Sequence, residues 1–114
     1  MTRIYKFLDR PAWKAAQAAG TFYGSPVDLA DGFIHFSTAS QAPETARLHF
    51  RWQGDLVLLA MEAEDLGEAL RWEPSRGGEL FPHLYASLAT ASVVAVRPLE
   101  LDADGIPQPG VLAP

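Results

Sequence analysis

The sequence has no cysteine, no long hydrophobic run and no cluster of basic residues, and each absence excludes a class of protein. Without cysteine there is no disulfide, no thiolate nucleophile and no cysteine-ligated metal. No apolar stretch approaches the roughly 20 residues that a membrane-spanning helix needs. Asp and Glu outnumber Lys and Arg by 14 to 9, and the formal net charge is −5. General binding to nucleic-acid phosphates is therefore not expected, because it depends on clustered positive charge.

Common catalytic and ligand-binding signatures are missing as well. The chain has no GxGxxG or P-loop pattern and no GxSxG nucleophile elbow. Its three histidines form no HxH or HxxxH pair, so the sequence gives no support for a metal site. The N-terminal residues enter a strand-like pattern directly, without a signal-peptide profile. The absence of cysteine fits a cytoplasmic protein.

The length and composition of the chain are those of one globular domain. The chain has 114 residues, of which 48% are hydrophobic and 20% charged, which suffices for a core of its own. Residues 3–8 alternate as a strand, with Ile4, Lys6 and Leu8 on one face. A helix should then run from Asp9, a good N-cap, to Gly20, with Trp13 and Ala16 on its buried side together with Gln17.

The stretch from Asp31 to Thr38 carries the most information about function. It opens on an Asp-Gly turn and continues as an alternating strand, with Ile34 and Phe36 on one face and Phe33, His35 and Ser37 on the other. Apolar side chains on one face suit a core, and an imidazole beside a hydroxyl suits the wall of a polar cleft. A single histidine on a strand is also compatible with a purely structural role, and that alternative stays open.

A second helix is expected next. Ser40 as N-cap places Pro43 in the first turn, and a Thr38–Gln41 capping box is the competing start. Ala42, Ala46, His49 and Phe50 have the spacing of a buried helical face, so we interpret His49 as a packing residue.

The second half of the chain reads mainly as strands. Residues 56–61 are apolar throughout, as in a strand covered on both faces. Residues 70–73 and 91–96 indicate two more strands, and Pro98 indicates that the last is an edge strand or contains a bulge. Residues 74–78 form a loop, and we expect short helical turns at 86–88. Residues 1–105 then form a single α+β domain around a mostly antiparallel or mixed sheet, and residues 106–114 are expected to be a disordered tail.

A second histidine with polar and aromatic neighbours lies at residues 79–85, where Pro82 restricts the backbone that presents His83. A capped helix start with a surface histidine is the structural alternative. The full set of candidate residues is His35, His83 and Glu73 for catalysis and Tyr5, Lys6, Ser37, Gln41, Phe81 and Tyr85 for ligand binding.

Together these residues resemble a small bacterial family known only as domain-of-unknown-function family 952. The resemblance rests on residues 4–6, Trp13, residues 32–38 with Gln41, residues 70–73 and the Phe-Pro-His-Leu-Tyr run at 81–85.

More distantly, the layout is similar to the ADP-ribosyltransferase and RNA 2'-phosphotransferase superfamily. That similarity implies a compact α+β fold with a split sheet and a nucleotide cleft, with His35 lining the cleft and Tyr5 or Lys6 standing where the phosphotransferases carry a histidine. NAD would then be a ligand or a substrate, and Glu73 or Glu79 would orient the ribose.

Three functions remain open at this stage. The protein binds or acts on NAD or an ADP-ribose derivative, or it is a non-catalytic module for a small metabolite or a protein partner, or it is a subunit of a larger assembly. In the first two, His35 and His83 converge on one pocket.

Overall fold

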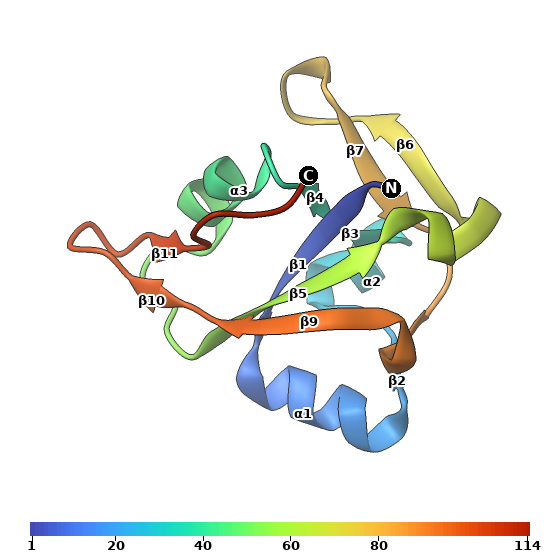
Figure 1. The fold of residues 1–114 in the computed structure, drawn as a ribbon, viewed down its shortest axis with the longest axis horizontal. Coiled ribbons are helices and arrows are strands. Elements are labelled where there is room, and N and C mark those ends of the chain that lie inside the picture. The colour runs from blue at the N-terminus through green and yellow to red at the C-terminus, as the bar shows by residue number, and fades with distance from the viewer.

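The computed structural model describes residues 1–114 and is organised around an antiparallel four-stranded sheet with the order β4-β1-β5-β9 (Figure 1). Its strands are β1 (Arg3–Asp9), β4 (Ser37–Thr38), β5 (Leu56–Glu62) and β9 (Val93–Pro98). Strands β1 and β5 pair along their whole length. The two predicted strands at the centre are confirmed, and β9 is at the edge that Pro98 indicated.

The sheet carries hydrophobic side chains on both faces because β5 is apolar at every position before Glu62 and the four central apolar residues of β1 are divided between the two faces. On one face the alternate residues of both strands pack with Trp13 and Ala16 of α1 (Arg10–Ala19). On the other face they pack with Ala42 and Ala46 of α3 (Ala42–His49). The sheet is therefore covered on both sides, as predicted for residues 56–61.

Helix α1 begins and ends where its sequence indicates. The Asp9 carboxylate accepts a hydrogen bond from the Ala12 amide at 2.8 Å, and Gly20 closes the helix in the left-handed conformation with a φ of 80°. Gln17 differs from the prediction, because its side chain is exposed and only Trp13 and Ala16 are buried.

A second antiparallel sheet, with the order β3-β7-β6, lies beside the first. It consists of β3 (Ile34–His35), β6 (Leu70–Pro74) and β7 (Leu80–Leu84). The predicted strand at 33–38 is therefore divided: its first part pairs with β7 and its last part, β4, pairs with β1. The predicted faces are retained, since Ile34 and Phe36 enter the core.

The remaining elements are short. They are β2 (Thr21–Phe22), α2 (Pro26–Asp31), β8 (Leu88–Ala89), β10 (Glu100–Leu101), β11 (Pro107–Gln108) and 3-10 turns η1 (Ala63–Ala69), η2 (Arg76–Gly78) and η3 (Thr90–Ser92). The prediction of helical turns at 86–88 is wrong, because no helix forms there. Pro82 is accommodated within strand β7, opposite Trp72, and the chain then passes directly to β8, which pairs with β2.

Two details of α3 differ from the sequence interpretation. Gln41, not Ser40, is the N-cap. Thr38 and Gln41 do form the reciprocal pair of the competing start, with the Thr38 amide donating to Oε1 at 3.0 Å and the Gln41 amide to Oγ1 at 3.3 Å. His49 is exposed in the last turn, so its interpretation as a packing residue is wrong.

The C-terminal segment, for which the composition predicted disorder, has a defined path in the structure. Pro107 is fully buried, the Tyr5 hydroxyl donates to the Ala113 carbonyl, and Arg97 donates to the Pro109 carbonyl. The segment lies beside α3 and β1 in Figure 1.

The fold is thus a compact single α+β domain with two antiparallel sheets and helices on both faces of the larger one. None of its helices has the length and apolar character that crossing a bilayer requires.

Candidate functional site

A groove of about 610 Å³ runs along the outer edge of β1. It exists because β4 pairs only with Ile4 and Tyr5, which leaves that edge of β1 without a strand neighbour from Lys6 onward. Helix α2, the end of α3 and the loop after β6 form its other walls. The groove is lined by residues 5–9, 25–27, Asp31, 35–37, Thr45, His49, Phe50, Gln53, Leu56, Ser75, Arg76, Phe81 and His83.

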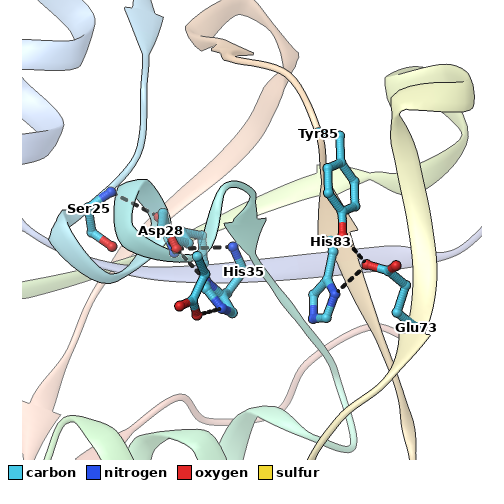
Figure 2. Close-up of polar contacts among 8 residues, drawn as sticks. Ser25, Asp28, His35, Glu73, His83 and Tyr85 are labelled. Carbon is cyan, nitrogen blue, oxygen red and sulfur yellow. Dashed lines mark hydrogen bonds and ion pairs between the residues drawn. The ribbon is translucent and has the colours of Figure 1, made fainter.

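Beneath one wall of the groove lies Asp28, a carboxylate whose side chain is 1% exposed. Its Oδ2 is 2.8 Å from Lys6 Nζ and accepts from the Ser25 amide at 2.9 Å. Its Oδ1 lies 2.6 Å from His35 Nδ1 and accepts from the His35 amide at 3.1 Å (Figure 2). One carboxylate thus joins β1, α2 and β3.

The local sequence explains how Asp28 reaches this position. Ser25 is the N-cap of α2 and Pro26 is its first residue, so Asp28 is at the third helical position, where its side chain reaches back to the Ser25 amide. Burial by itself would raise the pKa of Asp28, but the hydrogen bond from His35 and the Lys6 ammonium outweigh it and hold this pKa far below its ordinary value. Burial lowers the pKa of Lys6, and Asp28 opposes that effect.

His35 is held on both sides of its ring. Nδ1 contacts Asp28, and Nε2 lies 2.9 Å from Oδ2 of Asp31, the last residue of α2. A carboxylate only accepts hydrogen bonds, so the two bonds form together only when both ring nitrogens carry hydrogen. His35 is one third exposed and lines the groove.

His83 is held on one side only. Its Nδ1 is 2.9 Å from Glu73 Oε1, which also accepts the Tyr85 hydroxyl bond at 2.6 Å. The hydrogen bond from Tyr85, followed by that from His83, lowers the pKa of Glu73, and the Glu73 carboxylate raises the pKa of Tyr85. In Figure 2 the second ring nitrogen of His83 points away from Glu73. No protein group bonds to this nitrogen.

The two imidazoles lie close together. Their ring centroids are 5.6 Å apart, and the Phe33 ring contacts both, at 4.1 Å from His83 and 4.5 Å from His35. The alternation of the 33–38 segment places Phe33 and His35 on the same side, and β7 places His83 opposite His35 in the strand register.

The predicted site residues do not all reach the groove. Those that line it are His35, His83, Tyr5, Lys6, Ser37 and Phe81. Glu73 lies behind His83, and Tyr85 lines a separate depression of about 310 Å³. Gln41 is buried, with its amide nitrogen donating to the Leu80 carbonyl at 2.8 Å and to Glu79 at 3.1 Å. Tyr5 and Lys6 are themselves buried and bonded within the protein.

Sequence reasoning missed two residues of the site. Asp28 is not among the candidate residues, although the Ser-Pro-x-Asp pattern at 25–28 and the single lysine between apolar residues of the first strand were the available signals. Arg76 was passed over within a Pro- and Gly-rich loop, yet it lines the groove with its guanidinium 4.7 Å from the Phe81 ring centre. No group of three histidine or carboxylate side chains is arranged to hold a metal ion.

The fold and site define a small α+β domain with a histidine-lined groove, and comparison with known proteins shows which family the chain belongs to. The model of the family described as "Protein of unknown function (DUF952)" matches residues 7–96. The chain therefore belongs to the DUF952 family. No curated protein matches it.

Solved structures share its fold closely. The crystal structure of protein CC0527 from Caulobacter crescentus is 61% identical, with a TM-score of 0.93 over 94% of each chain. The solution NMR structure of CC0527 is also 61% identical, with a TM-score of 0.86 over 95% of this chain and 93% of that one.

Proposed function

We propose that the groove binds NAD or a related ADP-ribose derivative and that His83 takes part in acid–base chemistry on the bound molecule. The observation that carries this proposal is that His35 and His83, from two different strands, line one groove with their rings 5.6 Å apart. The groove volume of about 610 Å³ lies within the range of roughly 300–1,000 Å³ typical of small-molecule sites.

The chemistry of the walls supports a ligand that has both rings and hydroxyl groups. Phe81 offers an aromatic surface, and Ser37 offers a hydroxyl that both donates and accepts. His83 is suited to proton transfer because Glu73 fixes Nδ1 while Nε2 is left for the ligand. Glu73 is then a positioning residue, and the Asp28–Lys6 pair fixes the wall that carries His35.

A second candidate function is a non-catalytic binding module that uses the same groove. It is favoured by His35, whose ring nitrogens are both engaged by carboxylates and which is therefore a fixed contact surface rather than a proton carrier. In this case the ligand binds without being changed.

The experiment that tests both functions is an NMR amide-shift titration with NAD, ADP-ribose, nicotinamide and a 2'-phosphorylated dinucleotide, followed by an assay for nicotinamide release from NAD. Wild type is compared with His35→Ala, His83→Ala and Glu73→Gln. Shifts at residues 33–38 and 81–84 that weaken in the histidine variants support a nucleotide groove. Release of nicotinamide that is lost in His83→Ala supports the enzyme, and binding without release supports the module. If millimolar ligand shifts no amide, the proposal is refuted.

A further inference from the structure

The groove contains one arginine, Arg76, that no protein carboxylate contacts as an ion pair. Lys6 and both groove histidines at its centre are paired with Asp28, Asp31 or Glu73. Arg76 forms no ion pair. In a protein with a formal charge of −5, a half-buried guanidinium without an acidic partner is a candidate contact for an anion.

Arg76 is held over the groove by contacts that leave most of its hydrogen-bonding capacity unused. Its guanidinium stacks on Phe81, and its two terminal nitrogens lie 3.4 and 3.5 Å from the Thr45 hydroxyl oxygen. These are long contacts to a neutral oxygen, whereas a guanidinium has five N–H donors in a planar fork that matches two oxygens of a phosphate.

Two hydroxyl groups accompany this arginine. Ser37 Oγ and Thr45 Oγ1 are 2.8 Å apart, and Thr45 also donates to the Gln41 carbonyl at 3.2 Å. Hydroxyl hydrogens rotate, so either group can turn to an incoming acceptor. This wall of the groove thus presents the fixed guanidinium of Arg76 beside two hydroxyl groups that can reorient to donate hydrogen bonds. These are the components of a phosphate subsite.

The loop geometry fixes where Arg76 is presented. Strand β6 ends at Pro74, the Ser75 amide donates to the Glu79 carbonyl at 2.9 Å, and the Gly78 amide donates to the Ser75 carbonyl at 2.7 Å. Gly77 and Gly78 follow with φ angles of 68° and 79°, which glycine adopts without strain. The loop closes tightly behind Arg76, and this leaves its side chain directed across Phe81 to α3.

We infer that Arg76, with Thr45 and Ser37, forms a subsite for a phosphate group of the ligand. This inference rests on the proposed function and deepens it, because it assigns the phosphate end of an ADP-ribose-like ligand to the α3 side of the groove and the reacting end to the histidines. It also means that adenosine or nicotinamide alone should bind more weakly than a phosphorylated relative.

The test follows the side-chain Nε–H signal of Arg76 by NMR during titration with pyrophosphate, AMP, ADP-ribose and adenosine. Variant Arg76→Gln is compared with Arg71→Gln, which removes an arginine that stacks on Tyr85 outside the groove. Pyrophosphate, AMP and ADP-ribose should shift the Arg76 signal, and adenosine should not. The Arg76→Gln variant should bind AMP and ADP-ribose at least about tenfold more weakly than wild type and should bind adenosine with unchanged affinity. Its amide spectrum should otherwise match that of wild type. Arg71→Gln should bind as wild type does.

The outcomes separate the subsite from the proposed function. If ADP-ribose shifts residues 33–38 and 81–84 but binds equally to Arg76→Gln, the phosphate subsite is refuted and the nucleotide groove survives. If pyrophosphate shifts the Arg76 signal while ADP-ribose leaves the amide signals of His35 and His83 unchanged, the phosphate subsite is supported and the proposed function is refuted. If no phosphorylated probe shifts Arg76 at millimolar concentration, the subsite is refuted.

Discussion

Replacing Asp28 by asparagine should destabilise the domain severely, although the change removes only a charge. The asparagine side chain would keep the size of the original one but leave the Lys6 ammonium, 7% exposed, beside a neutral amide. Removing one partner of a buried ion pair costs about 3–5 kcal/mol, because the other charge stays buried without compensation. The free energy of unfolding of a domain of this kind is about 5–15 kcal/mol, so the expected loss is a large share of the total stability.

Urea unfolding followed by circular dichroism measures the effect. With a denaturant slope of about 1–3 kcal/mol per molar urea, the midpoint of Asp28→Asn should fall by at least about 1 M. Asp31→Asn is the matched control, since it also removes an acidic partner of His35 but one whose side chain is 47% exposed, and it should change stability by less than about 1 kcal/mol.

A double variant tests the assigned cause. Lys6→Met combined with Asp28→Asn removes both buried charges and should be more stable than Asp28→Asn alone. If Asp28→Asn leaves the urea midpoint unchanged, or if the double variant is less stable than the single one, the unpaired lysine is not the source of the loss.

Three other features of the structure also lead to predictions. Folding lowers the pKa of Asp28, so the stability that this carboxylate contributes is complete above its unfolded pKa of about 3.9 and is lost as the pH falls below that value. The urea midpoint should therefore decline less between pH 5 and pH 2 in Asp28→Asn than in wild type. Gly105→Ala should cost about 2–4 kcal/mol, because a Cβ there overlaps the Trp52 indole and the φ of 77° is left-handed, and a thermal midpoint equal to wild type would contradict this. Glu73→Gln should lower the pKa of Tyr85 toward its ordinary value of about 10 in an NMR titration of the tyrosine ring carbons, and a rise would show that the Glu73 carboxylate is not the cause.

Local patterns in the sequence predicted the elements whose stability depends on near neighbours. The helix from Asp9 to Gly20 was predictable because both caps act within a few residues of the helix ends. The side-chain faces of the 33–38 segment were predictable because the two-residue period of a strand persists even where the segment passes from one sheet to the other.

Features that depend on tertiary contacts were not predictable in this way. Asp28 meets Lys6 across 22 residues of chain, and no local pattern identifies such a partner. His49 has the spacing of a buried face, but at the end of α3 it is Phe50 that packs on the sheet, stacked on Phe7, and the His49 ring is exposed to the groove. The helix start considered at Pro82 does not form. Proline lacks an amide donor, but the Pro82 carbonyl accepts a hydrogen bond from the Phe36 amide at 3.1 Å, and Pro82 is part of strand β7.

The bonds that Asp28 makes to Lys6 and His35 also constrain how relatives of this protein can diverge in sequence. One carboxylate bonds both the buried ammonium of Lys6 and Nδ1 of His35. Replacing Asp28 leaves the buried ammonium without its partner, and replacing Lys6 leaves the buried carboxylate without its cation. Across the family, positions 6 and 28 should therefore be replaced together or not at all. A relative with an apolar residue at position 6 should lack the acid at position 28, and its groove would have a wall of different chemistry and hence a different ligand.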